Sequence, residues 1–390
     1  MVREKSAVYP LSADPIHNGH IYTLAVAANS GLFDKVIVAV GNDCNKNYLF
    51  DLDERLFLAK KAVYSSGFEK NKVSVESFYG LLRNYAREQG AKFIVRGCRN
   101  SKDWEYEKIL GEFNGEYGLQ TLIFPASKEF ENLSSTYVKS IAAEGGFVHN
   151  LVHPSVKQAL EERLREVSLI GVTGNMGAGK TTFCEKLVEY SQLNGGNLSH
   201  IDFDKLVHSL YFGDSSLSYE VRKNIRASFG EDVFNSSGLD RRKLAEIVFG
   251  DSDKREELSR ILMVPSMIKF EEELRQRKGI VLVDAAYFTE YNLLPLVNYN
   301  VILVSCDENE RFRRVFRRDG INREEIEAKT KAQHSEDLKR KIIREAQDKY
   351  NHGFFHEIDS TNGMRLDEIM EKIESYFPLL KSGVRENAIV

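Results

Sequence analysis

The sequence predicts an α/β protein made of two domains, each built on a doubly wound parallel sheet. Two segments repeat one pattern, in which a short apolar strand is followed by a polar or glycine-rich turn and then by a helix. Further apolar runs lack the clean alternation of half-exposed strands, which is typical of parallel strands covered on both faces. Because such strands alternate with helices in both halves, the doubly wound arrangement is favoured.

The expected elements follow in chain order. The first repeat has a strand over Ala7–Tyr9, the turn PLSADPIHNG and a helix over His20–Asn29. The second has a strand over Ser168–Thr173, the turn GNMGAGK and a helix over Thr182–Tyr190. The other expected strands are Lys35–Val40, Lys92–Val95, Thr121–Phe124, Ile280–Val283 and Asn300–Val304.

The two halves meet without a flexible linker. One amphipathic helix is expected over Pro154–Val167, with Val156, Leu160 and Leu164 on one stripe. No Gly/Ser-rich or Pro-rich stretch separates the halves, so we expect their mutual orientation to be restrained. The sequence therefore predicts domains over residues 1–163 and 168–378, followed by a flexible tail over 379–390.

Composition excludes several classes of protein. The chain has 390 residues, of which 42% are hydrophobic and 29% charged, as in ordinary soluble globular proteins. A net charge of −4 provides no global basic field that would attract nucleic acid or an anionic membrane. The apolar stretches have the length of strands rather than of membrane spans. The four cysteines form no CxxC pair, which fits a reducing cytosol, and we expect a cytoplasmic protein: Cys44, Cys98, Cys184 and Cys306.

A histidine motif opens the helix of the first repeat. His17 and His20 stand three residues apart on one face near the helix N-terminus, and Gly19 between them lets a phosphate approach the backbone. Such groups suit the stabilisation of a pentavalent α-phosphate without a covalent intermediate. The alternative interpretation is a pair of surface histidines.

Two further segments of the first half suit phosphate binding. Arg96 and Arg99 follow the strand Lys92–Val95, at the edge where a parallel sheet places its ligand groups. Another helix opens at Ser134, Ser135 and Thr136, whose hydroxyls and free N–H groups can hold β- and γ-phosphates. An ordinary serine N-cap is the alternative and is compatible with that role.

The second half carries a phosphate-binding loop, the P-loop, at residues 174–181. GNMGAGKT matches G-x-x-x-x-G-K-[ST], in which glycines let backbone N–H groups close around phosphate oxygens. Lys180 is expected to reach the β/γ-phosphates, and the Thr181 hydroxyl to bind Mg²⁺. The other expected nucleotide-binding positions are Gly174, Asn175, Met176, Gly177, Ala178, Gly179 and Thr182.

Acidic and basic residues complete this half. Asp202 or Asp204 could accept the proton of an attacking hydroxyl, but a helix cap for Lys205–Tyr211 is the favoured interpretation when they are considered alone. Asp284 follows a strand and either orients Mg²⁺ through water or caps the next segment. The arginine run over residues 311–318 is either a solvated helix face or a mobile lid over the phosphoryl group.

Over residues 5–163 the chain resembles bacterial-type phosphopantetheine adenylyltransferases. The matching motifs are HNGH at 17–20, SFxGLL at 77–82, AREQGA at 86–91 and RGxR at 96–99. The resemblance implies an HxGH nucleotidyltransferase fold of Rossmann-like type, in which Ser12, Lys46 and Arg96 hold the phosphate of phosphopantetheine. It implies that Leu82 and Asn114 line the pantetheine arm. It further implies that ATP is held by His17, His20, Arg99, Glu107, Ser134, Ser135 and Thr136, with His20, Lys46 and Arg99 as the catalytic groups.

Over residues 168–375 the chain resembles dephospho-coenzyme A kinases. The matching features are the P-loop, IDxDK at 201–205, RxxxRD at 314–319 and Gln333. The resemblance implies a P-loop kinase fold in which Lys180 and Arg314 are catalytic, Asp204 is the base for the ribose 3′-hydroxyl, and Arg314 and Arg318 belong to the lid. The chain departs from the family where HPxI has become Val264-Pro265-Ser266-Met267, and where the proline of D-x-P-L-L has become Ala286.

Together the two resemblances imply a bifunctional enzyme that uses ATP and Mg²⁺, because the product of the first half is the acceptor of the second. The expected partners are small-molecule substrates, with neither nucleic acid nor membrane, and homo-oligomerisation is left open. One alternative is an active first half joined to a nucleotide-binding regulatory module. Another is an enzyme pair with other substrates, such as cytidylyl transfer plus a kinase for a nucleoside or another small acceptor.

Overall fold

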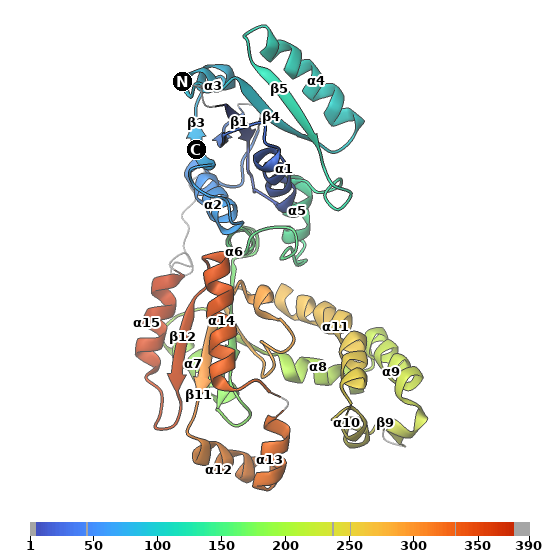
Figure 1. Cartoon of the computed structure of the whole chain (residues 1–390). Helices are drawn as coiled ribbons and strands as arrows, with labels where there is room; N and C mark the ends of the chain where they lie inside the picture. Colours follow the sequence, from blue (N-terminus) through green and yellow to red (C-terminus); the bar gives the residue numbers. More distant parts are fainter. Residues whose placement is uncertain (1–4, 44–45, 236–237, 250, 332, 378–390) are drawn as a thin grey trace. The chain divides into compact units, whose positions relative to one another are not determined.

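The structure is a computed structural model, and it describes residues 5–43, 46–235, 238–249, 251–331 and 333–377. The chain forms two compact units (Figure 1). Unit 1 comprises Met1–Arg165 and Arg344–Gly353, and unit 2 comprises Glu166–Ile343 and Phe354–Val390. Cys44 and the expected tail over 379–390 lie outside the described residues.

Unit 1 is built on a five-stranded parallel sheet in the order β3-β2-β1-β4-β5. Its strands are β1 (Ser6–Leu11), β2 (Lys35–Gly41), β3 (Val73–Phe78), β4 (Phe93–Cys98) and β5 (Gln120–Pro125). Its helices are α1 (Asn18–Asn29), α2 (Leu52–Ser65), α3 (Leu82–Glu88), α4 (Ser101–Gly115), α5 (Ser135–Ala143) and α6 (Pro154–Arg165). Both faces of β2 are buried, since Val36 and Val38 belong to one apolar cluster and Ile37 and Ala39 to another.

Unit 2 is built on a second five-stranded parallel sheet in the order β12-β11-β6-β10-β7. These strands are β6 (Val167–Thr173), β7 (Leu198–Asp202), β10 (Gly279–Asp284), β11 (Val301–Ser305) and β12 (Phe355–Asp359), with β8 (Phe234–Asn235) and β9 (Gly238–Leu239) as a separate antiparallel pair. The α-helices are α7 (Lys180–Leu193), α8 (Phe203–Phe212), α9 (Ser216–Phe229), α10 (Arg241–Phe249), α11 (Ser252–Arg275), α12 (Glu308–Asp319), α13 (Arg323–Thr330), α14 (Glu336–Tyr350) and α15 (Leu366–Tyr376). The short 3₁₀ helices are η1 (Glu231–Val233) and η2 (Leu294–Val297). The fold class predicted from the sequence, two parallel-sheet α/β domains, is confirmed.

The differences from the predicted elements have physical causes. The sequence did not predict β3 and β12, which lie at the edges of their sheets and carry polar residues among the apolar ones. The helix predicted over Pro154–Val167 is shorter, because α6 ends at Arg165. Glu166 adopts a left-handed backbone with a φ of 56°, and Val167 already belongs to β6. Val156 and Leu160 are buried as expected of the apolar stripe.

Residues Arg344–Gly353, which include the end of α14, belong to unit 1. The carbonyl oxygen of Tyr350 accepts hydrogen bonds from the Ser65 hydroxyl at 2.9 Å and from Nε2 of His153 at 3.0 Å. Nε2 of His352 lies 3.0 Å from Oε1 of Gln158 in α6. A segment that follows the kinase motifs in sequence therefore completes the packing of unit 1. The predicted range 1–163 did not include this segment.

The histidines of this contact predict that unit 1 loses stability in mild acid. Burial lowers the pKa of His153 to about 4 and that of His352 to about 3, so both are neutral when folded. In the unfolded chain they titrate near pH ~6.5 and take up protons that the folded state cannot hold. The free energy of unfolding should be maintained above about pH 6.5 and should fall as the pH drops toward about 4.

Denaturant unfolding of the full chain at several pH values measures the free energy of unfolding. Hydrogen exchange of the amides of unit 1 at the same pH values shows whether the loss of stability lies in this unit. The double variant His153→Asn/His352→Asn cannot titrate in this range and is expected to show a shallower pH dependence. An equally steep dependence in the double variant would exclude these two histidines as the cause.

None of the helices in the described part of the chain combines the length and the apolar character needed to span a membrane.

Candidate active sites

Unit 1 has a cavity of about 560 Å³ along the ends of β1, β2 and β4, which is a usual size for a small-molecule site. Parallel strands end at a common edge, so side chains from separate motifs meet there. The cavity brings together most of the residues predicted for this half, namely Ser12, His17, His20, Lys46, Arg96, Arg99, Glu107, Ser134, Ser135 and Thr136.

The two histidines of the HNGH motif stack on one another, with ring centroids 3.7 Å apart. Nδ1 of His20 accepts a hydrogen bond from the backbone N–H of His17 at 3.3 Å. Burial lowers the pKa of His17 to about 3 and that of His20 well below its ordinary value, so both rings are neutral. With Nδ1 as an acceptor, the proton of His20 lies on Nε2, which leaves that atom as a hydrogen-bond donor.

The arginines of the RGxR motif are held by carboxylates of α4. Nε and Nη2 of Arg96 form a two-point ion pair with Glu107, with both distances 2.5 Å. Nε of Arg99 lies 2.8 Å from Asp103, and its Nη1 donates to the carbonyl of Leu133 at 3.2 Å. Bidentate pairs fix the planar guanidinium group, so both cations are positioned before any ligand binds.

The remaining polar groups join three loops around the cavity. Nζ of Lys46 lies 3.3 Å from the Ser12 hydroxyl, so a cation and a donor converge at the end of β1. Ser134 accepts a hydrogen bond from the Tyr137 N–H and therefore caps α5, as the alternative interpretation allowed. The Ser135 hydroxyl donates to the carbonyl of Pro15 at 2.8 Å, which connects α5 to the loop before α1.

Two buried charged residues, Asp14 and Arg55, hold the backbone around this cavity in place. Neither was predicted as a site residue. The Asp14 carboxylate accepts hydrogen bonds from the N–H groups of Leu49 and Phe50 and pairs with Lys139 at 2.7 Å. Arg55 is 1% exposed and donates to the carbonyls of Ser12 and Gly41. Both positions belong to the stretches that resemble the adenylyltransferases, but contacts between segments that are distant in sequence leave no local sequence signal.

The two residues predicted for the pantetheine arm lie outside the lining of this cavity. Leu82 opens α3 and packs against the apolar cluster around Tyr85. The Asn114 amide donates to the Thr121 hydroxyl at 3.4 Å.

The P-loop of unit 2 lies between β6 and α7, as predicted. Gly177 and Gly179 have φ values of 86° and 91°, which side chains other than glycine rarely adopt. A Cβ atom at Gly174 would lie 2.1 Å from the carbonyl oxygen of Val304, so this position has no room for a side chain. The glycine pattern is thus required by the backbone that surrounds the phosphate site.

Lys180 and Thr181 open α7 beside the end of β10. The Thr181 hydroxyl donates to Oδ2 of Asp284 at 2.6 Å, while Oδ1 of this buried carboxylate has no hydrogen-bond partner in the described part of the chain. Hydroxyl and carboxylate oxygens are ligands that Mg²⁺ prefers. The donor set therefore fits the cation that accompanies ATP, and of the two roles expected for Asp284 it favours the one at Mg²⁺.

The structure separates the roles of the two neighbouring aspartates. Asp202 ends β7 and caps α8 by accepting a hydrogen bond from the Lys205 N–H at 2.8 Å. Asp204, in the first turn of α8, accepts only a longer one from the Ala286 N–H at 3.3 Å. Burial raises the pKa of Asp204 to about 6, with Lys180 opposing the shift. Capping thus belongs to Asp202, and Asp204 has the higher basicity expected of a general base.

The pKa of Asp204 predicts the pH dependence of phosphoryl transfer by unit 2. Only the ionised carboxylate accepts a proton, so kcat/KM should rise with pH and level off above about pH 6. Assays of the kinase step between about pH 5 and pH 8 measure this rise, with residual activity of Asp204→Asn as the control. A flat wild-type profile across this range would remove Asp204 from the base role.

The predicted arginine helix is α12, and its residues face different surroundings. Arg314 donates to the hydroxyl and carbonyl of Ser360. Its Nη1 also lies close to Gly179, because a Cβ atom added to this glycine would be only 3.2 Å away. Arg311, which was not singled out, is buried and donates to the Thr330 hydroxyl. Arg318 is exposed and pairs with its neighbour Asp319. Arg314 and Arg311 thus lie against the P-loop, whereas Arg318 pairs with the last residue of its own helix.

The other predicted loop positions divide by exposure. Asn175 and Ala178 are buried, and the Ala178 carbonyl accepts a hydrogen bond from Ser360 at 2.6 Å. The N–H of Met176 donates to Oε1 of Gln333 at 2.9 Å, which explains the glutamine noted in the sequence. Thr182 is exposed.

Comparisons with known proteins match the two units separately. The family model described as Dephospho-CoA kinase matches residues 168–348, and the one described as Cytidylyltransferase-like matches residues 8–141. The phosphopantetheine adenylyltransferase of Pseudarthrobacter chlorophenolicus is 42% identical over 157 residues, which is 40% of this chain and 92% of that protein. That of Streptomyces coelicolor is 41% identical over 162 residues, which is 41% of this chain and 98% of that protein.

A solved dephospho-CoA kinase from Campylobacter jejuni is 19% identical to this chain, with a TM-score of 0.30 over 56% of this chain and 100% of that one.

Proposed function

Because the chain belongs to the phosphopantetheine adenylyltransferase family and carries a second domain of the dephospho-CoA kinase family, we propose that it catalyses the last two steps of coenzyme A synthesis. Unit 1 transfers AMP from ATP to 4′-phosphopantetheine and releases pyrophosphate. Unit 2 phosphorylates the ribose 3′-hydroxyl of the resulting dephospho-coenzyme A. The observation that carries the proposal is the presence of both domains in one chain, since the product of the first is the acceptor of the second.

In unit 1 the acceptor phosphate attacks the α-phosphorus of ATP, and the bond to pyrophosphate breaks. Lys46 and Ser12 converge where the attacking phosphate would be held. Nε2–H of the neutral His20 donates to a non-bridging α-phosphate oxygen, where charge grows in the transition state. Arg99 and the N-terminus of α5 hold the departing β- and γ-phosphates.

In unit 2 the 3′-hydroxyl attacks the γ-phosphorus of a second ATP, and ADP leaves. Asp204 takes the proton of the hydroxyl, and Lys180 holds the β- and γ-phosphates. Thr181 and Asp284 would hold Mg²⁺, which neutralises phosphate charge when bound. Arg314 lies beside Gly179 and supports the loop through Ser360. We assign the reactions to residues 1–163 and 168–378, with Arg344–Gly353 as a structural part of unit 1.

The proposed partners are the small-molecule substrates, and the proposed location is the cytosol, where ATP is supplied. The described cysteines Cys98, Cys184 and Cys306 are free thiols, which agrees with a reducing compartment.

Incubation of the full chain with 4′-phosphopantetheine, ATP and Mg²⁺, followed by mass spectrometry, tests the proposal. Dephospho-coenzyme A should appear first and coenzyme A later, and CTP should not replace ATP. Formation of a cytidylyl product, or accumulation of dephospho-coenzyme A without any coenzyme A, would contradict the assignment of the substrates or of the second step.

A further inference from the structure

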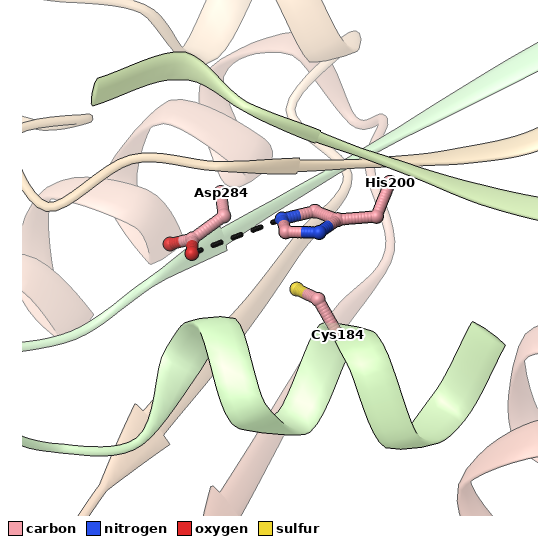
Figure 2. A group of neighbouring side chains, drawn as sticks. All are labelled: Cys184, His200 and Asp284. Carbon is pink, nitrogen blue, oxygen red and sulfur yellow. Dashed lines mark ion pairs between the residues drawn. The ribbon is translucent and has the colours of Figure 1, made fainter. Parts of the chain in front are cut away.

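Three side chains of unit 2 converge beside the P-loop, and their chemistry differs from that of a magnesium site. Cys184 lies on α7 one turn after Thr181, His200 lies on β7, and Asp284 ends β10. Figure 2 shows the three side chains pointing toward one another. One ligand atom of each, the cysteine sulfur, an imidazole nitrogen and a carboxylate oxygen, lies within 4.8 Å of the other two.

Two polar atoms of this cluster lack the hydrogen bonds that buried groups normally form. Nε2 of His200 and Oδ1 of Asp284 are both buried, and neither has a hydrogen-bond partner among the residues that the structure describes. Nε2 of His200 lies 3.8 Å from the other carboxylate oxygen, Oδ2, which is too far for a hydrogen bond. Asp284 is 2% exposed, so leaving one carboxylate oxygen unpaired is costly. A bound ligand that accepts electron pairs from both residues would remove this cost.

We propose that Cys184, His200 and Asp284 form a site for a thiophilic divalent cation such as Zn²⁺. A thiolate, a neutral imidazole and a carboxylate are the three kinds of side chain that bind Zn²⁺, and a thiolate disfavours Mg²⁺. Ligand bonds of roughly 2.0–2.3 Å place tetrahedral ligand atoms about 3.3–3.8 Å apart. Nε2 of His200 and Oδ2 of Asp284 lie 3.8 Å apart, and all three ligand atoms lie within 4.8 Å of one another, so shifts of roughly 1 Å would close the cluster around a cation.

Binding has a defined charge balance. The thiol loses its proton to solvent, and the thiolate and carboxylate together offset the charge of the cation. An uncharged imidazole offers a nitrogen lone pair to the cation. Water can take the fourth position, as at zinc sites with three protein ligands.

The site shares Asp284 with the proposed magnesium site, and this predicts inhibition. The carboxylate accepts the hydrogen bond of Thr181, whose hydroxyl is expected to bind the cation of Mg–ATP. A Zn²⁺ ion held by Asp284 would draw it away from Thr181 and add positive charge beside the P-loop. Zn²⁺ should therefore inhibit phosphorylation by unit 2, a consequence that rests on the proposed function, whereas the metal site itself does not.

Titration of the nucleotide-free full chain with Co²⁺, a spectroscopic substitute for Zn²⁺, tests the site directly. A thiolate-to-cobalt charge-transfer band should appear in the wild type and be abolished by addition of Zn²⁺. Cys184→Ser should remove the band, and His200→Asn should weaken Co²⁺ binding about tenfold or more. Cys306→Ser in the same unit and Cys98→Ser in unit 1 are matched controls that should retain the band.

Circular dichroism of each variant checks that the fold is kept, and the histidine variant provides a second test if Cys184→Ser fails to fold. A wild type without a thiolate band, or a band that persists in folded Cys184→Ser, would overturn the metal site. A band that depends on Cys184, together with a kinase step unaffected by Zn²⁺, would overturn the inhibition and leave the site standing.

Discussion

Asp204→Asn is expected to lower kcat of the kinase step by about 10²–10⁴-fold, the range for loss of a positioned general base. Asparagine has nearly the same shape and can still accept the hydrogen bond from the Ala286 N–H, so the local structure should persist. It cannot take the proton of the 3′-hydroxyl. Phosphorylation of supplied dephospho-coenzyme A measures the loss, while the affinity for ATP should change little.

Asp202→Asn is the matched control for this result. Asparagine is as good a helix cap as aspartate, so α8 should remain stable and phosphorylation should be affected far less. If Asp202→Asn abolishes activity while Asp204→Asn is fully active, the roles of the two carboxylates are reversed.

His20→Ala is expected to reduce adenylyl transfer by about 10²–10³-fold, corresponding to a loss of about 2.7–4 kcal/mol of transition-state stabilisation. The neutral ring donates through Nε2–H, and alanine removes that donor at the position where charge develops. The rate of pyrophosphate release with 4′-phosphopantetheine and ATP measures the loss.

His20→Gln is the matched variant, because its amide N–H can reach a similar position and should restore part of the rate. Near-normal formation of dephospho-coenzyme A by a folded His20→Ala enzyme would exclude the HNGH motif from this step.

Local patterns in the sequence were sufficient to predict the fold class and the residues that meet at the carboxyl ends of the parallel strands. The HNGH, RGxR and P-loop motifs each follow a strand, and parallel strands bring such turns together, so the contents of the unit 1 cavity could be predicted. The edge strands β3 and β12 were missed because their polar residues dilute the apolar signal.

Long-range contacts could not be predicted in this way. Arg55 fixes the loop at Ser12 through backbone carbonyls, which have no sequence signature. The same holds for the contact of Tyr350 and His352 with α6 and its flanking residues, which assigns a segment near the C-terminus to unit 1. The roles of Asp202 and Asp204 also depended on geometry, since either residue could have capped α8.

We propose that one chain carries two complete active sites, each with its assigned residues within one unit. Lys180→Ala removes a β/γ-phosphate contact of the P-loop and leaves every residue assigned to unit 1 unchanged. Mass spectrometry of this variant with 4′-phosphopantetheine, ATP and Mg²⁺ tests the claim most directly. We expect dephospho-coenzyme A to accumulate without coenzyme A, and added His20→Ala enzyme to restore coenzyme A because the intermediate diffuses between molecules. A folded Lys180→Ala enzyme that forms neither product would contradict it, because the two reactions would then depend on a shared site.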